Sequence, residues 1–180
     1  IAGKSLIEIN INKARKIKEI KKIIVVYNKK DFNRINSLKL KNVKFIVGGK
    51  NRQQSAFNAL KYLIKNKGFS KVLIHDVARP NFSLKLLNKI ISKMKTAKAV
   101  VPKININDAV KQKIDSSLNE YILGKNRDNL FLTQTPQAFK LNEVYHLHKT
   151  NYAKYKDDDI SLYMDLNKVK FIEGEKNNFK

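Results

Sequence analysis

With 180 residues, 42% of them hydrophobic, the chain is long enough for one domain with a sizeable core, and its composition argues against wholesale disorder. No apolar run approaches the roughly 18 residues that a transmembrane helix requires, and the lack of cysteine excludes disulfide frameworks and thiolate metal sites. The formal net charge is +23, from 38 Lys and Arg against 15 Asp and Glu.

This positive charge has two interpretations. It could indicate a phosphate-rich partner such as nucleic acid, an anionic membrane or a nucleotide, or Lys and Asn could simply fill surface positions. Nucleic-acid surfaces usually add clusters of Arg and interleaved aromatic residues, and neither is evident in this sequence. We therefore favour surface composition as the cause, and expect a cytoplasmic protein with no membrane or nucleic-acid partner.

The apolar periodicity predicts helices and strands in alternation through the first hundred residues. In chain order they are a helix at 5–20, a strand at 23–27, a short helix at 31–38, a strand at 43–47, a helix at 55–64, a strand at 72–74, a helix at 83–94 and a strand at 97–101 that ends before Pro102. This alternation indicates an α/β fold with a Rossmann-like, mostly parallel sheet and helices on both faces. Right-handed crossovers would place the strand ends on one edge of the sheet.

The pattern changes after Pro102. Residues 109–114 and 120–123 alternate polar and apolar side chains, which predicts an antiparallel ribbon that leaves the sheet as a protruding β-arm. Such a ribbon suits a dimerisation arm around residues 103–130, although a simple surface hairpin fits the pattern equally well. A helix at 141–155 and a strand at 168–173 complete the prediction. Because no interdomain linker interrupts the chain, we expect one domain over residues 1–180.

The segment 72–80 points most directly to a function. Its apolar strand ends at His75 and Asp76, and Arg79 and Pro80 follow. A buried parallel strand delivers polar groups in this way to the carboxyl edge of an α/β sheet, where such folds bind ligands. Asp76 could coordinate Mg²⁺ and Arg79 could bind a phosphate bidentately, whereas a surface ion pair is the alternative. His75 suits orientation of this loop better than acid–base catalysis.

Other polar motifs have a structural and a functional interpretation each. Gly48 and Gly49 could admit a ligand close to the backbone or form a tight turn, and Ser55 could bond a ligand or the backbone at a helix start. The acids at 157–159 are typical of a solvated cap at a helix N-terminus. His146 and His148 stand two residues apart on a helix, do not share a face, and are therefore improbable as a metal pair.

Four motifs together carry a family resemblance. They are, in order, Gly48-Gly49-x-x-Arg52-Gln53-x-Ser55, His75-Asp76-x-Ala78-Arg79-Pro80, Thr135-Pro136-Gln137 and Glu173-Gly174-x-x-Asn177-Asn178-Phe179-Lys180. Their combination resembles the methylerythritol phosphate cytidylyltransferase family of the non-mevalonate isoprenoid pathway, over nearly the whole chain. Ribitol-phosphate-type cytidylyltransferases share the general pattern and are the nearest alternative. A non-catalytic basic binding protein on the same scaffold is a second alternative.

The resemblance implies an enzyme that joins CTP to 2-C-methyl-D-erythritol 4-phosphate and releases pyrophosphate, with Mg²⁺ or another divalent cation. It implies a catalytic set of Lys180, Asp76 and Arg79, with Asp76 as the metal ligand. The implied sugar-phosphate contacts are Asp76, Arg79, Thr135 and Arg127, the last reaching across a homodimer. The implied nucleotide contacts are Gly48, Gly49, Ser55, Lys180 and the backbone at Val77.

Three departures from the family pattern accompany this resemblance. The family's opening strand, its Gly-rich phosphate loop and the Pro-Lys-Gln that follows them are absent. We therefore expect a chain truncated at its N-terminus and, because the last motif breaks off at Lys180, at its C-terminus, or else a chain that cannot catalyse alone. Ala109 stands where the family usually has Thr, and Asp157 stands where a substrate-binding Thr is common.

Overall fold

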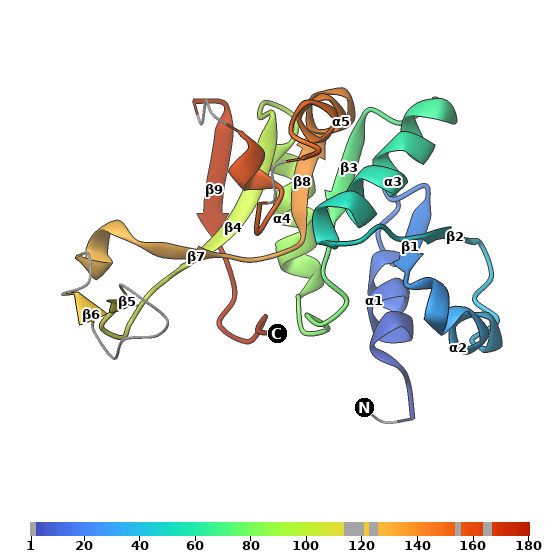
Figure 1. The fold of residues 1–180 in the computed structure, drawn as a ribbon, viewed down its shortest axis with the longest axis horizontal. Helices are drawn as coiled ribbons and strands as arrows, with labels where there is room; N and C mark the ends of the chain where they lie inside the picture. Colours follow the sequence, from blue (N-terminus) through green and yellow to red (C-terminus); the bar gives the residue numbers. More distant parts are fainter. Residues whose placement is uncertain (1–2, 114–120, 123–125, 154–155, 164–166) are drawn as a thin grey trace.

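A computed structural model describes residues 3–113, 121–122, 126–153, 156–163 and 167–180 of the chain. Figure 1 shows an α/β fold in which helices cover a central sheet. The helices are α1 (Leu6–Ala14), α2 (Phe32–Ser37), α3 (Arg52–Lys65), α4 (Leu84–Lys93) and α5 (Leu141–Thr150), with short 3-10 turns η1 (Lys29–Asp31), η2 (Arg127–Asn129) and η3 (Ile160–Leu162). The strands are β1 (Ile23–Tyr27), β2 (Val43–Val47), β3 (Lys71–Ile74), β4 (Ala99–Asn105), β5 (Gln112–Lys113), β6 (Tyr121–Ile122), β7 (Phe131–Thr133), β8 (Gln137–Lys140) and β9 (Val169–Glu173).

The main sheet has five strands in the order β3-β8-β4-β7, with β9 paired to β4. Strands β3, β4 and β9 run in one direction, because β3 and β4 are both antiparallel to β8 and β9 is parallel to β4. Strands β7 and β8 run against them. The parallel pair β1–β2 forms a separate two-stranded sheet among the described residues. The Rossmann-like α/β architecture is therefore confirmed.

Alternate residues of β4 face the two sides of the main sheet. Val100 belongs to one apolar cluster, which consists mainly of buried residues of α4 together with Ile17, Ala138 and Ile172. Ala99 and Val101 contact a second cluster on the opposite face. That cluster contains Leu60 and Leu63 of α3, Leu141 and Val144 of α5, Phe139 and Ile160. Because these two clusters bury opposite faces of one strand, the predicted placement of helices on both faces is confirmed.

Strands β1, β2 and β9 follow the predicted boundaries to within one residue, while several helix ends differ. Helix α1 ends at Ala14 instead of residue 20, yet Ile17 is buried, so the apolar period continues beyond the helix itself. Helix α3 begins at Arg52, three residues earlier than predicted, because the Asn51 side chain caps it by accepting a hydrogen bond from the Gln54 backbone N–H. Helix α5 ends at Thr150.

The prediction that Pro102 ends its strand is wrong, since β4 continues to Asn105. The carbonyl of Pro102 accepts a hydrogen bond from the Gln134 backbone N–H, in the loop between β7 and β8. Pro102 has no backbone N–H to donate. Because it lies beside the loop between β7 and β8, no strand residue there depends on a hydrogen bond from it. The proline is tolerated because the neighbouring strand is interrupted beside it.

The protruding arm lies beyond the ends of β4 and β7 (Figure 1). There, β5 and β6 pair antiparallel, as the alternating pattern predicted. Residues 114–120 and 123–125 of the predicted ribbon lie outside the described residues. Within the described part of the chain, no helix is both long enough and apolar enough to cross a membrane.

Candidate functional site

The carboxylate of Asp76 lies among three cations, just past the C-terminal end of β3. Arg52 Nε lies 3.2 Å from Asp76 Oδ1, Lys180 Nζ lies 2.9 Å from Oδ2, and Arg79 Nε lies 3.9 Å from Oδ2. These cations come from the start of α3, the segment after β9 and the loop after β3. The fold thus brings together the predicted residues Asp76, Arg79 and Lys180, and adds Arg52, to which the sequence assigned no role.

The electrostatic environment keeps this cluster charged. Burial raises the pKa of Asp76, but the hydrogen bond from Lys180 and the charge of Arg52 outweigh burial and leave the pKa below its ordinary value. Burial also lowers the pKa of Arg79 against the opposing effect of Asp76, although a guanidinium stays protonated near neutral pH. The Lys180 side chain is 56% exposed. A surplus of accessible positive charge at the end of a strand suits an anionic ligand such as a phosphate.

A hydrogen-bond chain beneath Asp76 fixes the backbone of the loop. The Asp76 backbone N–H donates to Thr135 Oγ1 over 3.0 Å, and that oxygen lies 3.1 Å from His75 Nδ1. His75 Nε2 lies 3.0 Å from both Asn10 Oδ1 and the Arg79 carbonyl oxygen, so Nε2 carries the proton and Nδ1 accepts. Burial lowers the pKa of His75 to about 4, which keeps the ring neutral. This geometry suits the orienting role predicted for His75.

Helix α1 holds the same loop from the other side. Asn10 Nδ2 donates to the Val77 carbonyl oxygen over 2.9 Å. Lys13 Nζ donates to the carbonyl oxygens of Pro80 and Phe82, at 2.7 and 2.9 Å. Val77 is 46% exposed, so this residue stands at the surface next to Asp76 in the loop.

Arg52 joins Asp76 to a second carboxylate that belongs to a distant segment. Its Nη2 lies 2.6 Å from Asp159 Oδ2, and Asp159 Oδ1 lies 3.0 Å from His148 Nε2. Asp159 and His148 are 1% and 0% exposed. Burial raises the pKa of Asp159, but the His148 hydrogen bond and the Arg52 charge together outweigh burial and leave the pKa below its ordinary value. The prediction of a solvated acidic cap is therefore wrong for Asp159, because α3 and α5 enclose it; Asp157 is exposed.

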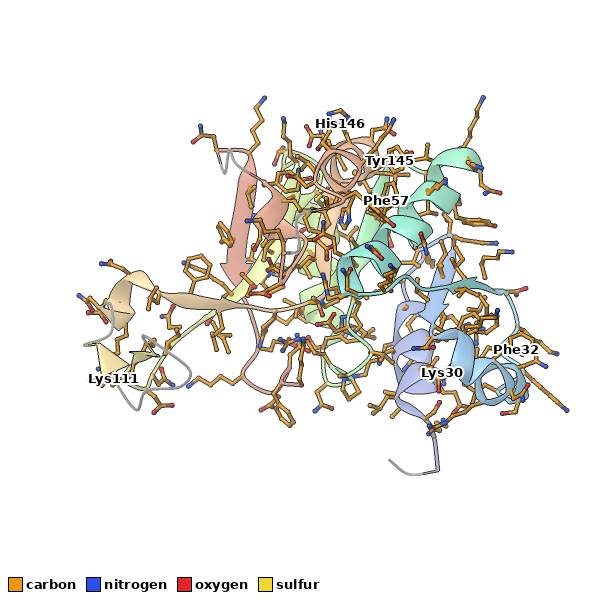
Figure 2. All side chains as sticks on the ribbon, in the orientation of Figure 1. Lys30, Phe32, Phe57, Lys111, Tyr145 and His146 are labelled. Atoms are coloured by element: carbon orange, nitrogen blue, oxygen red, sulfur yellow. The ribbon has the colours of Figure 1, made fainter. Side chains whose placement is uncertain are left out.

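The periodicity of apolar residues in the sequence could have predicted that His148 is buried. The residue shares the buried stripe of α5 with Leu141 and Val144, at positions i, i+3 and i+7. Figure 2 shows His146 on the outer side of α5, while Tyr145 lies beside Phe57 of α3, with ring centroids 5.6 Å apart. The prediction that the two histidines do not share a face is confirmed.

The Gly48-Gly49 turn has a structural reason for its two glycines. A Cβ atom on Gly49 would lie 2.4 Å from Gln54 Cβ, and one on Gly48 would lie 2.8 Å from Ser55 Oγ. The Gly49 backbone N–H donates to Ser55 Oγ over 3.1 Å, and this hydroxyl donates to the Asn51 carbonyl oxygen. Ser55 therefore bonds the backbone at the helix start, and the turn sets the position of Arg52 as α3 begins.

Arg127 lies apart from this cluster. It belongs to η2, and its Nη1 donates to the Asn107 carbonyl oxygen over 2.6 Å. In the part of the chain that the structure describes, no hydrogen bond or ion pair links Arg127 to Asp76, Arg79, Thr135 or Lys180.

A metal ion could be held at Asp76 only with help from a ligand. The described residues contain no group of three or more His, Asp or Glu side chains placed to bind a metal. Mg²⁺ often takes only one or two carboxylates and completes its shell with substrate phosphates and water. Asp76 fits that mode, since each carboxylate oxygen has a second lone pair besides the one facing Arg52 or Lys180.

Comparison with known proteins decides the family. The family model described as IspD, 2-C-methyl-D-erythritol 4-phosphate cytidylyltransferase, matches residues 1–180. The chain belongs to this family. The chain is 44% identical over 179 residues to a protein of Pelagibacter ubique named as a bifunctional IspD/IspF enzyme, covering 99% of this chain and 47% of that protein.

Further relatives agree with this family assignment. The 2-C-methyl-D-erythritol 4-phosphate cytidylyltransferase of Clostridioides difficile is 36% identical over 151 residues, which cover 82% of this chain and 62% of that protein. The chain thus spans less than two thirds of both curated relatives. The crystal structure of 4-diphosphocytidyl-2C-methyl-D-erythritol synthase from Anaerococcus prevotii matches with a TM-score of 0.85 and 32% identity, covering 100% of this chain and 81% of that one. The resemblance carried by the four motifs is confirmed.

Proposed function

We propose that the protein carrying this chain joins CTP to 2-C-methyl-D-erythritol 4-phosphate and releases pyrophosphate, in the cytoplasm. The observation that carries the proposal is the placement of Asp76 within 4.0 Å of Arg52, Arg79 and Lys180 at the carboxyl end of β3. Family membership supports the same reaction, and both the family description and the name of the Clostridioides difficile relative give 2-C-methyl-D-erythritol 4-phosphate rather than ribitol phosphate.

The proposed reaction needs positioning and charge stabilisation more than covalent chemistry. An oxygen of the sugar phosphate attacks the α-phosphorus of CTP and forms a P–O bond, while the bond from that phosphorus to the oxygen bridging to the β-phosphate breaks. Lys180 would neutralise charge at the α-phosphate, a task suited to a compact ammonium. Arg79 would grip a phosphate with its planar guanidinium. Asp76 would hold these cations in place until substrate oxygens replace it as their partner.

The remaining predicted contacts belong to the same proposal. The turn at Gly48 and Gly49, with Ser55, would place the start of α3 against the nucleotide, and the backbone of the exposed residue Val77 would lie beside it. Thr135 is 4% exposed and its hydroxyl bonds the Asp76 backbone, so we propose that it serves the sugar phosphate mainly by holding that loop.

Mg²⁺ is the divalent cation that we propose. Asp76 would hold the ion together with substrate oxygens, and the chemistry that the ion would supply is Lewis-acid stabilisation of phosphate charge. The Asp76 carboxylate and the phosphate-rich substrates together match the way in which proteins bind Mg²⁺.

We also propose that residues 1–180 form one domain and that the arm mediates a homodimer. Phe131 and Leu132, where β7 enters the arm, are 38% and 53% exposed, which leaves apolar surface for a second copy. Arg127 would then act on the neighbouring subunit's substrate, in keeping with its separation from Asp76.

The test is pyrophosphate release by the full protein, supplied with CTP, Mg²⁺ and either methylerythritol phosphate or ribitol phosphate. Turnover with methylerythritol phosphate alone is expected. Turnover with ribitol phosphate alone would favour the ribitol-type reaction. A folded protein that is silent with both would contradict the proposal and favour the non-catalytic alternative.

A further inference from the structure

The segment that carries Lys180 has no secondary structure of its own. Residues 174–180 follow β9 and form neither helix nor strand, and the Phe179 side chain is 61% exposed. Nevertheless, Lys180 Nζ lies 2.9 Å from Asp76, and Asn178 is fully buried. Other parts of the molecule must therefore hold this tail, which we define as residues 174–180.

The buried side-chain amide of Gln134 bonds the tail backbone, as a neighbouring strand would do in a sheet. Gln134, which is 2% exposed, lies in the loop between β7 and β8. Its Nε2 donates to the carbonyl oxygens of Glu175 and Asn178, at 2.8 and 3.2 Å, and its Oε1 accepts from the Glu175 backbone N–H at 3.0 Å. A single side chain thus bonds three backbone groups of the tail, and it is the partner of the Glu175 backbone N–H, which would otherwise be unpaired.

Asn178 connects the tail to both loops of the Asp76 site. Its Nδ2 donates to the Thr135 carbonyl oxygen over 2.9 Å, and its own carbonyl oxygen accepts from Arg79 Nη1 over 2.7 Å. Thr135 bonds the Asp76 backbone, and Arg79 lies beside the Asp76 carboxylate. Asn178 therefore fixes the tail two residues before Lys180, through its side chain on the Thr135 loop and its backbone carbonyl on the Arg79 loop.

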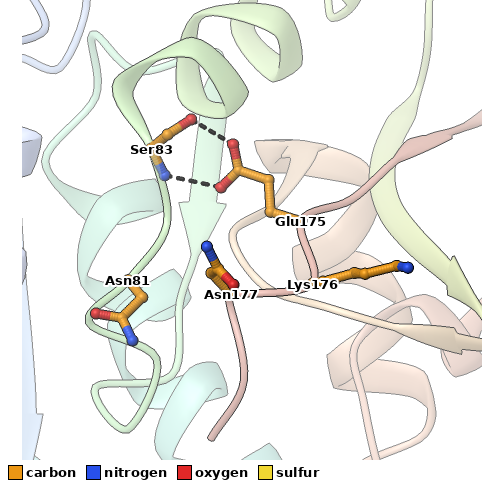
Figure 3. A pocket seen from close by; sticks show the side chains of 5 residues that line it. All are labelled: Asn81, Ser83, Glu175, Lys176 and Asn177. Atoms are coloured by element: carbon orange, nitrogen blue, oxygen red, sulfur yellow. Dashed lines mark hydrogen bonds between the residues drawn. The ribbon is translucent and has the colours of Figure 1, made fainter.

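The base of the tail has a further attachment, shown in Figure 3. The Ser83 backbone N–H and hydroxyl both donate to the Glu175 carboxylate. These residues line a pocket of about 360 Å³ together with Asn81, Lys176 and Asn177. The exposed Asn177 lines this pocket, whereas its neighbour Asn178 is buried in the network described above.

We propose that Gln134 and Asn178 are positioning residues that place the Lys180 ammonium at the Asp76 site. The proposal rests on the proposed function, since it concerns how Lys180 reaches the reacting phosphates. Neither residue is required to touch a substrate. Their effect on the reaction passes through the tail backbone to Lys180, so removing either amide should misplace this ammonium while Asp76 keeps its contacts with Thr135 and Arg52.

The kinetic test compares Asn178→Ala with the matched control Asn177→Ala in the full protein. We expect Asn178→Ala to lower kcat about 100-fold, the scale of a small misplacement of a catalytic group, and Asn177→Ala to stay close to wild type. In a Lys180→Ala background, Asn178→Ala should have no further effect, because both changes remove the same ammonium from the site. Equal losses in the two backgrounds would overturn the proposal, since they would indicate a general structural effect.

A second measurement does not depend on activity. Amide hydrogen exchange in residues 174–180 should rise in Asn178→Ala and in Gln134→Glu, a variant of nearly the same size that loses the Nε2 donor, and should not rise in Asn177→Ala. Unchanged exchange in a folded variant would overturn the proposal. If wild type exchanges slowly here but releases no pyrophosphate from CTP, then the proposed function fails while the anchoring of the tail stands.

Discussion

The imidazole Nε2 of His148 lies 3.0 Å from Oδ1 of Asp159, and neither side chain is more than 1% exposed. The other oxygen of Asp159 lies 2.6 Å from Arg52, which in turn contacts Asp76. A buried polar pair on the α5 side of the molecule is thus connected to the candidate site through one guanidinium. A planar guanidinium can serve two carboxylates at once, whereas an ammonium cannot do so with the same fixed geometry.

Removing the charge of Asp159 should destabilise the fold. In Asp159→Asn, Arg52 loses its shorter ion pair, and we expect the free energy of unfolding to fall by about 2 kcal/mol, since Arg52 keeps partial contact with water. Urea denaturation measures this change. The matched control is Asp157→Asn, an exposed acid two residues away, which should change stability by less than about 0.5 kcal/mol. An equal fall in the free energy of unfolding in the two variants would contradict a stabilising role for the buried Asp159 ion pair.

Arg52→Lys tests the bridge between the two carboxylates. We expect kcat/KM for cytidylyl transfer to fall about tenfold or more, because a lysine cannot maintain both contacts that fix Asp76 and Asp159. The exposed Arg34→Lys makes the same chemical change away from the site and should retain full activity. Wild-type kinetics in Arg52→Lys would contradict this prediction, because they would show that a positive charge at residue 52 is sufficient for activity without the bridging geometry.

Lys180→Ala should lower kcat by about 10²–10³, the usual cost of losing one group that stabilises transition-state charge. Asp76→Ala and Arg79→Ala should also reduce transfer severely without unfolding the protein. Lys176→Ala removes an exposed lysine from the same tail and is expected to leave kcat near wild type. Near-normal turnover in all three site variants would mean that the site is wrongly assigned, provided that circular dichroism shows each variant to be folded.

The pH dependence of stability should carry the signature of His75. Its pKa is about 4 in the folded protein and 6.5 ordinarily, so the unfolded state binds more protons between these values. Stability is therefore fully present above the unfolded pKa and decreases as the pH falls toward 4. From pH 7 to 5 we expect His75 to account for a loss of about 2 kcal/mol in the free energy of unfolding, measured without divalent cations.

The variant His75→Gln can accept from Thr135 and donate to Arg79, but it does not titrate. It should therefore lose this part of the pH dependence, whereas the exposed His146→Gln should retain it. Asp76 and Asp159 have pKa values below the ordinary range, so their contributions disappear only at lower pH, below about 4. A steep decline between pH 7 and 5 in His75→Gln would place the titrating group elsewhere.

Gly49→Ala should affect nucleotide binding as well as stability. The added Cβ would overlap Gln54 and displace the first turn of α3, so we expect KM for CTP to rise. Gly68→Ala is a useful comparison, because Gly68 has a φ of +81° and open space around it. That variant should lose about 1 kcal/mol of stability through backbone strain and leave the KM for CTP unchanged.

Local sequence patterns predicted the elements whose side chains alternate or repeat regularly. The β-branched runs of β1 and β2 gave correct strand boundaries, and the polar residues after β3 predicted a site at its end. Strand β8 was not predicted, because Gln137–Lys140 is short, follows Pro136 and contains no β-branched residue. The burial of Asp159 could not be predicted either, because α3 and α5, far apart in sequence, must pack before it loses contact with water.

The attachment of the tail also bears on how the protein should respond to heat. Hydrogen bonds of side-chain amides, Arg79, the Glu175 carboxylate and the Gly174 backbone hold residues 174–180, and the large apolar residue of this segment, Phe179, stays mostly exposed. Each such hydrogen bond contributes only about 1 kcal/mol net, far less than the two apolar clusters that flank β4. The tail should therefore detach in a local opening before the sheet melts. Warming would then inactivate the protein reversibly at temperatures where its circular dichroism is still that of the native fold.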